Sequence, residues 1–388
     1  MYKNRIQKLL TLLLLVLALA MAGCSQETDD NPEPDKQGSG KEENTEPLTI
    51  SETSVFLKSG ETAALKVNRE DVTFAVKDES VATVDNSGTV TAKAHGVTYV
   101  TASSGEDQVT CGILVDVLEN ASYVDISEKT MQPVIYQREL IKWTIMQSWD
   151  YVPETGDYFF IQQYDTTPSD DIVTRLYPDG TEAYMRFLDA GHGNILSVEY
   201  VDNDHIYLWV NANGDVNGTH DGVMRVLWED GGIIDNDAEQ TWTIEGMTFY
   251  PSFAVDGETR LAVVASKQGT KMNYRLYDLD SILADDPVLL TSFQVTLGTK
   301  EGDIGYHSFQ GLCLEGDTIY ILEGNPGTNI YVAALDFSGQ TLAIQLVNGQ
   351  DDISYREPEG IQVIDGVIYI GIGSGESGNR RANIFEMK

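Results

Sequence analysis

The sequence has few cysteines, few basic residues and no stretch of helical periodicity. Twenty-five Lys and Arg stand against 61 Asp and Glu, which gives a net charge of −36. A field of this sign repels nucleic acid and anionic lipid surfaces, and the sequence has no repeated basic runs to offset it. Nucleic-acid binding is therefore excluded. A polyanionic ligand would need a bridging cation or a local basic patch.

Three cysteines, Cys24, Cys111 and Cys313, occur in 388 residues. Cys111 and Cys313 stand in the apolar, strand-like stretches VTCGILV and GLCLEG, in what we argue below are separate domains. We expect both to be buried free thiols and not a disulfide pair. Neither has the histidine and basic setting that a nucleophile needs, so a catalytic thiolate is not expected.

Several enzyme signatures are also missing. The sequence contains no HExxH, no GxSxG and no phosphate-binding loop. GIGSGE at residues 371–376 follows a strand-like run but opens no helix, so it fails as a dinucleotide-binding fingerprint. The sequence still allows acid–base catalysis by side chains that come from separate segments.

Residues 1–23 have the pattern of a secretory signal. A basic start is followed by the apolar run LLTLLLLVLALA, which is too short for a membrane span, and then by Ala22-Gly23-Cys24. Cysteine after Ala-Gly resembles the lipobox of bacterial lipoproteins, although Met21 stands where that family prefers Leu. The resemblance implies that Cys24 becomes the lipidated first residue and the only contact with the membrane.

Residues 24–46 are acidic, rich in Pro, Gly and Ser, and lack large apolar side chains. Such a segment cannot offset its chain entropy by burial, so we predict a disordered tether. Acidic residues directly behind the lipidated cysteine resemble the surface-export signal of lipoproteins from the Bacteroides group. We therefore expect a lipid-anchored protein of the outer membrane that is exposed at the cell surface.

Residues 47–117 alternate apolar and polar residues in short runs separated by turns, which predicts a small β-sandwich. The pieces ESVATVD, SGTVTA and HGVTYVTA resemble the bacterial Ig-like domain, group 2. Members of that family act as spacers or adhesion modules, and a single copy behind a tether favours the spacer role. Residues 118–130 are predicted to be a linker.

Residues 131–388 contain a repeat of about fifty residues. YHSFQG at 306–311 and YREPEG at 355–360 lie 49 residues apart, and each precedes a strand, a Glu-Gly or Asp-Gly turn and an IYI strand. About five such units fit the span, and stacking them radially gives a five-bladed β-propeller. Because the chain stops on a third strand, we expect the closing blade to take its outer strand from residues 133–144.

The order of QSWDY, TRLYPDG, YMRF, AGHGN, YHSFQG and EPEG resembles a family of five-bladed propellers over roughly residues 140–388. That family includes helveticin J, the teichoic acid biosynthesis protein C group and receptor-binding propellers of some phages. The resemblance implies recognition or processing of cell-wall or surface glycans. The net charge of this chain suits an anionic teichoic polymer badly.

In a propeller, the segments that lead into the innermost strands converge near the central axis. We therefore expect a ligand site there. In the second unit, Glu199 is expected to be the counterpart of Gln310 and Glu359. The candidate catalytic residues are His192, His307 and Glu359. The expected ligand-binding residues are Gln147 with Ser148, His192, Tyr250, His307, Gln310, Glu357 and Glu359.

Each of these residues also has a structural interpretation. Gly191 and Gly193 can hold a turn in which His192 only ties two blades together, and Glu357 and Glu359 can accept backbone N–H groups of a neighbouring blade. The arginines at 175, 225 and 275 are expected to pair with acids between strands. His205 and His220 are expected to face solvent.

Three functions remain open. The first is a surface lipoprotein that binds a glycan. The second is a hydrolase or lyase that uses a His–carboxylate pair, or a calcium ion held by Glu and His. The third is a protein-binding, structural or adhesion module. The run NGDVNG at 213–218 resembles the start of a calcium loop, but Met224 takes the place of its final Glu, so a chance turn is favoured.

Overall fold

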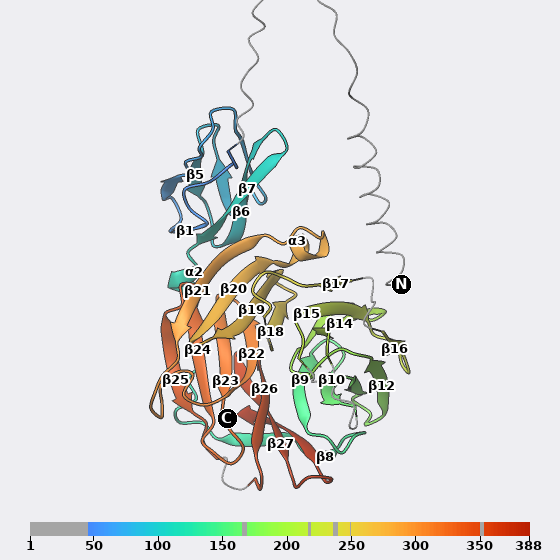
Figure 1. Ribbon diagram of the computed structural model, residues 1–388. Helices are drawn as coiled ribbons and strands as arrows, with labels where there is room; N and C mark the ends of the chain where they lie inside the picture. Colours follow the sequence, from blue (N-terminus) through green and yellow to red (C-terminus); the bar gives the residue numbers. More distant parts are fainter. Residues whose placement is uncertain (1–45, 165–168, 216–218, 236–239, 249, 350–352) are drawn as a thin grey trace, which may run out of the picture. The chain divides into compact units, whose positions relative to one another are not determined.

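The computed structural model describes residues 46–164, 169–215, 219–235, 240–248, 250–349 and 353–388 (Figure 1). The predicted signal, Cys24 and the predicted tether lie outside these residues. The regular secondary structure of the described residues is nearly all β-strand, as expected. Its helices are two short ones, α2 (Val117–Asn120) and α3 (Leu279–Leu283). No helix in these ranges is long and apolar enough to cross a membrane.

The first domain is a β-sandwich. One sheet has the strand order β1-β7-β6-β3 and the other has the order β2-β5-β4. The core between them is built from alternate residues of the strands, among them Val90, Val100 and Ile113. The strands are β1 (Ser54–Leu57), β2 (Thr62–Ala64), β3 (Thr73–Val76), β4 (Ala82–Val84), β5 (Thr89–Ala92), β6 (Gly96–Ser104) and β7 (Asp107–Val115).

The remaining strands form five sheets, and these are the blades of a propeller. The innermost strands β9, β13, β18, β22 and β26 each contact the next, and β26 contacts β9, so the ring closes. The five-bladed prediction is confirmed. The first two blades contain β9 (Met146–Val152), β10 (Asp157–Gln163), β11 (Asp171–Leu176), β12 (Glu182–Phe187) with β16 (Ile233–Ile234), and β13 (Leu196–Asp202), β14 (His205–Ala212), β15 (Gly222–Leu227), β17 (Thr241–Trp242).

The last three blades continue the same order around the ring. The final blade takes its outer strand from the start of the domain, because β8 pairs with β28. The strands are β18 (Ser252–Asp256), β19 (Leu261–Gln268), β20 (Lys271–Asp278), β21 (Leu289–Thr296); β22 (Phe309–Glu315), β23 (Thr318–Glu323), β24 (Tyr331–Asp336), β25 (Thr341–Leu346); and β26 (Glu357–Ile364), β27 (Val367–Ser374), β28 (Arg381–Met387), β8 (Met131–Glu139).

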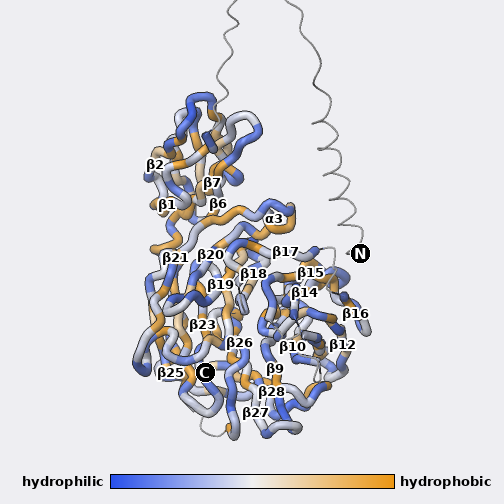
Figure 2. The backbone as a smooth tube through the Cα atoms, in the orientation of Figure 1, coloured by the Kyte–Doolittle hydropathy of each residue, from blue (hydrophilic) through white to orange (hydrophobic). Residues whose placement is uncertain are grey.

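The local sequence explains the hairpins of the repeat. Asp365 and Gly366 have φ of 51° and 73°, the two positive values that a tight two-residue turn between twisted strands requires. The strand on either side alternates apolar and polar residues. Figure 2 shows the result as hydrophobic residues spread along the strands and hydrophilic residues at many of the connecting loops.

A large side chain joins the first and last blades, and buried ion pairs join strands within a blade. Trp149 on β9 is 1% exposed and donates its indole N–H to the Gly360 carbonyl of the last blade at 3.1 Å. Arg175 pairs with Asp157, and Arg225 donates to Glu199 at 2.8 Å. These two arginines therefore pair with acids between strands, as predicted.

Glu199 is not the counterpart of Gln310 and Glu359 that the repeat predicts. Its carboxylate accepts from Trp209 Nε1 and Arg225 Nε and from Arg260 Nη1 at 2.7 Å. These donors lower its pKa against the opposing effect of burial, which is the larger single cause. Glu199 is thus a buried structural anion. The unit in which it lies is two residues shorter, and the alignment placed it wrongly.

The sandwich packs against the third blade. Leu114 of β7 and Val117 belong to one hydrophobic core with residues of β19, β20 and β21. A Cβ on Gly112 would come within 1.9 Å of the Leu290 carbonyl oxygen, so the two backbones lie in close contact. Cys111 and Cys313 are both buried and free, as expected, and burial raises the pKa of Cys111 to about 12.

Candidate functional site

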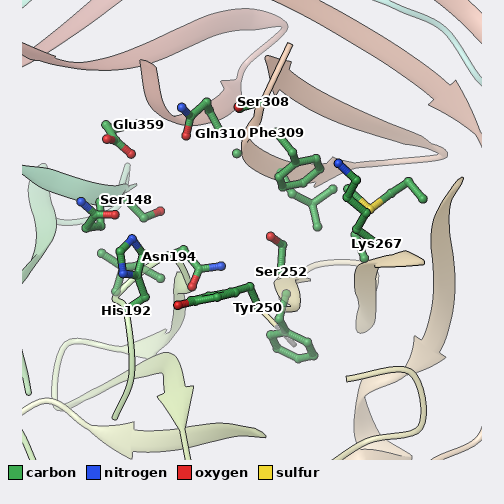
Figure 3. A pocket seen from close by; sticks show the side chains of 17 residues that line it. Ser148, His192, Asn194, Tyr250, Ser252, Lys267, Ser308, Phe309, Gln310 and Glu359 are labelled. Atoms are coloured by element: carbon green, nitrogen blue, oxygen red, sulfur yellow. The ribbon is translucent and has the colours of Figure 1, made fainter. Parts of the chain in front are cut away.

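The segments that lead into the inner strands surround a cavity of about 570 Å³ (Figure 3). All five blades contribute to its wall, which combines apolar groups with amides, hydroxyls, one imidazole and one carboxyl. The lining residues are Gln147, Ser148, His192, Asn194, Leu196, Tyr250, Ser252, Phe253, Ala265, Lys267, Met272, Ser308, Phe309, Gln310, Gly311, Leu312 and Glu359.

The two glycines beside His192 are required by packing. Gly191 and Gly193 have φ of 139° and 82°. A Cβ on Gly191 would lie 2.9 Å from the His220 side chain, and one on Gly193 would lie 3.0 Å from Asp171 Oδ1. The turn is therefore tightly packed, while the His192 ring itself lines the cavity. Gly191 and Gly193 therefore have the structural role, and His192 is the residue that faces the cavity.

The hydrogen bond of His192 fixes which ring nitrogen carries the proton. Gln163 Nε2 donates to His192 Nδ1 at 3.2 Å, which leaves the proton on Nε2. Burial lowers the pKa of His192 below its ordinary value, so the ring is neutral at pH 7. A neutral ring with Nε2–H is a hydrogen-bond donor to a ligand oxygen.

Tyr250 stands beside this ring in a left-handed conformation, with φ of 54°. Its ring meets His192 edge-on at 5.7 Å and His220 edge-on at 5.8 Å between centroids. The Pro251 carbonyl oxygen accepts from His220 Nε2 at 3.2 Å and from Asn194 Nδ2 at 3.1 Å. These contacts hold Tyr250 in the cavity wall, at a backbone angle that a bulky residue rarely adopts.

The prediction that His220 faces solvent is wrong, since this residue is 2% exposed. The loop that carries it folds back under Tyr250, and sequence polarity alone gave no signal of a partner thirty residues away. His205 is exposed and pairs with Asp202, as expected.

Glu359 is the carboxyl of the cavity. It is 4% exposed and lines the wall, and its carboxyl has no hydrogen-bond partner within the described residues. Burial, and secondly the neighbouring Glu357, raise the pKa of Glu359 well above its usual range. This shift favours the neutral carboxylic acid form of Glu359. Gln310, on the adjacent blade, donates its amide N–H to the Gly324 carbonyl at 3.2 Å.

Two of the expected site residues do not line the cavity. His307 Nδ1 lies 3.2 Å from Asn325 Nδ2, and its ring stacks on Tyr331 at 5.6 Å between centroids. Glu357 lies on the same strand as Glu359, and burial raises its pKa. The cavity thus brings together Gln147, Ser148, His192, Tyr250, Gln310 and Glu359 of the expected set.

Tyr250 was expected at the site, but Tyr306 and Tyr355, which occupy the same position in the next two units, were missed. Tyr250, Tyr306 and Tyr355 precede the inner strands of three successive blades, in YPSF, YHSF and YREP. They are 36%, 45% and 43% exposed. Tyr355 is also left-handed, with φ of 48°, and its ring lies 3.8 Å from the Arg380 guanidinium carbon. Aligning all three units on Tyr-x-Ser/Glu would have found them.

The described residues contain no group of three or more His, Cys, Asp or Glu side chains placed to hold a metal ion. Residues 216–218 of the run NGDVNG lie outside the described part of the chain. The charged residues of the cavity wall are Lys267 and the acid Glu359.

The models of two protein families match the sequence. Residues 145–386, more than half of the chain, match the model of the phage five-bladed beta propeller receptor binding platform domain. Residues 44–113 match the bacterial Ig-like domain, group 2. No curated protein matches the chain.

Among solved structures, the tail fiber of Staphylococcus aureus phage P68 shares 18% identity at a TM-score of 0.55. The match covers 68% of this chain and 53% of the tail fiber, so the chain spans about half of that protein's length. At this identity the likeness shows the fold alone.

Two glycoside-hydrolase structures also match. One is the GH43_1 enzyme from Xanthomonas citri, at 12% identity over 69% of this chain and 91% of the enzyme. The other is the exo-beta-1,3-galactanase of Phanerochaete chrysosporium, at 8% identity over 66% and 63%. Their TM-scores of 0.42 and 0.41 are too low to carry an argument about activity.

Proposed function

Because the chain belongs to the phage five-bladed β-propeller receptor-binding platform family, we propose that its propeller binds a surface or cell-wall glycan in the cavity among the inner strands. The observation that carries this proposal is the composition of the cavity wall. It offers neutral hydrogen-bonding groups from separate blades around an aromatic face, and its volume of about 570 Å³ is that of a small-molecule site. Hydroxyl groups and the apolar faces of sugar rings match such a wall.

Tyr250 supplies the aromatic face in this proposal. The T-shaped contacts with His192 and His220 set the direction of its ring. Backbone strain of the kind seen at Tyr250 costs on the order of 1–3 kcal/mol and persists where the surroundings enforce it, frequently at binding sites.

Hydrolysis is the second candidate, and the cavity supports it less well. Glycosidases of the common kinds use two carboxyl groups on either side of the scissile bond. Glu359 is the one carboxyl among the described residues of the cavity wall. In the same residues, no hydrogen bond or ion pair joins His192 to a carboxyl. A tuned acid–base pair is therefore not preformed, and binding without turnover is the function we favour.

We further propose that the protein is exposed on the cell surface, held by a lipid on Cys24 to the outer membrane, with the Ig-like domain as a spacer. Support comes from the sequence ahead of residue 47 and from the close contact between Gly112 and Leu290. Because the Ig-like domain packs against the third blade, we expect the two domains to move together. Globomycin treatment of producing cells, with mass spectrometry of the mature N-terminus, tests the lipidation.

A glycan array tests the binding. The purified full chain is compared with the variants His192→Ala and Tyr250→Ala and with a control, His205→Ala, whose ring is exposed away from the cavity. We expect selective glycan binding that both cavity variants weaken by about tenfold or more, as loss of a well-placed hydrogen bond or stacking contact predicts. The control should bind like the wild type.

Thermal unfolding of every variant accompanies the array. If the wild type binds no glycan while His192→Ala loses stability, His192 is a packing residue and a protein partner replaces the glycan in the proposal. Release of reducing sugar from a bound glycan would instead establish hydrolysis.

A further inference from the structure

The buried carboxyl of Glu359 lacks the partner that such a group normally has. Buried carboxyls are almost always hydrogen-bonded or paired, because an unsatisfied one loses its hydration without compensation. Glu359 is 4% exposed, lines the cavity and has no hydrogen-bond partner within the described residues. In Figure 3, Glu359 lies between Gln310 and Ser148, on the same side of the cavity as His192. A ligand in the cavity could supply a partner for this carboxyl.

The surroundings of Glu359 determine what kind of atom this is. Glu357, two residues earlier on β26, disfavours a second negative charge, and Arg380 on the loop between β27 and β28 opposes that effect more weakly. Burial and Glu357 thus favour the protonated carboxyl, which presents one O–H donor and a carbonyl acceptor. This is the hydrogen-bonding pattern that complements a hydroxyl group.

The rest of the cavity wall repeats this neutrality. His192 is an uncharged ring with a donor at Nε2, and the polar side chains beside it are amides and hydroxyls. Lys267 is the one cation among the described residues of the wall, and it is exposed. An anionic sugar would lose its hydration against Glu359 without a buried cation to replace it, within a protein of net charge −36.

We propose that the cavity recognises an uncharged sugar unit, with the Glu359 carboxylic acid and the His192 Nε2–H both donating to its oxygens. This inference rests on the proposed function and adds the class of glycan: neutral hexose-type units, in preference to uronic, sulfated, phosphorylated or amino sugars. The same cavity would then discriminate against anionic wall polymers by the absence of a paired cation.

The test measures how two substitutions of Glu359 change the affinity for neutral and charged sugars. The full chain is titrated with the neutral oligosaccharide that binds best on the array, and with its uronate, sulfated and amino counterparts. Glu359→Gln keeps the shape and a donor, so neutral-sugar affinity should stay within about threefold of wild type. Glu359→Ala leaves the ligand oxygen unpaired and should weaken binding by about tenfold or more.

Glu315→Gln is the matched control. Glu315 lies at the opposite end of the inner strand β22 and also has a pKa raised by burial, but it does not line the cavity. It should leave affinity unchanged. The affinity of the wild type should fall as the pH rises and Glu359 ionises, and the Glu359→Gln variant should lack that fall. The charged groups that act on Glu359 are Glu357 and Arg380, and His192 and Lys267 line the same cavity.

Three outcomes overturn the inference. Preferential binding of an acidic sugar means that the cavity holds an anion. Preferential binding of an amino sugar that is lost in Glu359→Gln means that Glu359 acts as a carboxylate. Either result leaves glycan binding itself intact. Failure of every saccharide to bind removes the proposed function and this inference together.

Discussion

Gly371 offers a sharp test of how the blades carrying the cavity are locked together. This residue lies on β27 at ordinary backbone angles, against Trp149 of the first blade. A Cβ there would lie 2.3 Å from Trp149 Cδ1 and 2.7 Å from the Glu359 carbonyl oxygen. Both distances are shorter than side chains tolerate, and Trp149 is only 1% exposed, so neither neighbour can move away freely.

Gly371→Ala is therefore expected to destabilise the propeller. Overpacking a core costs about 1–3 kcal/mol. Displacing Trp149 also disturbs its hydrogen bond to Gly360, which contributes about 1 kcal/mol. The expected loss is about 2–4 kcal/mol, or about 4–15 °C in Tm for a domain of this size. Because the methyl group also presses on the Glu359 backbone, sugar affinity should fall as well.

Gly257→Ala is the matched control, since the nearest atom to its Cβ is Glu199 Cγ at an ordinary 3.9 Å. It should change stability by less than about 0.5 kcal/mol. The measurement is urea unfolding followed by tryptophan fluorescence, with the midpoint and slope fitted for each variant. Equal midpoints for the two variants would refute the tight packing of Trp149 between the first and last blades.

Further outcomes follow from other residues. Tyr250→Gly should relieve left-handed strain, leaving Tm unchanged or higher while glycan binding is lost; a drop of several degrees would show that Tyr250 is a structural wedge. Gly112→Val should separate the two domains, detected as faster proteolysis between them, because Leu290 blocks any Cβ. Burial raises the pKa of Glu323 to about 7. The folded state therefore holds a proton that the unfolded chain has lost, and stability should fall as pH rises from about 4 to about 7. Glu323→Gln should reduce that fall in urea titrations, and the raised pKa of Glu359 contributes a further fall of the same sign. The lowered pKa of Glu199 acts in the opposite direction, since its stabilising contribution is lost as pH falls below about 4.

The fold could be predicted from the sequence because its signals are local. A hairpin is specified by its own turn, as Asp365-Gly366 shows, and a fifty-residue repeat of hairpins leaves few architectures. The closing pair of β8 with β28 followed from counting strands alone. The repeat did not determine the register of the second unit, which is two residues shorter. For this reason Glu199 was predicted to lie at the axis, although its carboxylate is bound by Arg225 and Arg260.

The site was less predictable because side-chain direction is a tertiary property. The repeat located the segments that surround the cavity, and His192 and Glu359 lie in its wall. It could not show that His307 turns toward Asn325 and Tyr331, two residues before Phe309, which lines the cavity. Nor could polarity show that His220 is buried under Tyr250, since a loop residue is buried only by what folds over it.

Hydrogen exchange on the full chain, with and without the best neutral oligosaccharide, tests the central claim most directly. If the cavity is the binding site, the sugar should slow exchange in the segments around His192, Tyr250 and Gln310, which belong to different blades, and leave the Ig-like domain unchanged. Slower exchange confined to the Ig-like domain or to the outer strands would contradict a glycan site in the cavity.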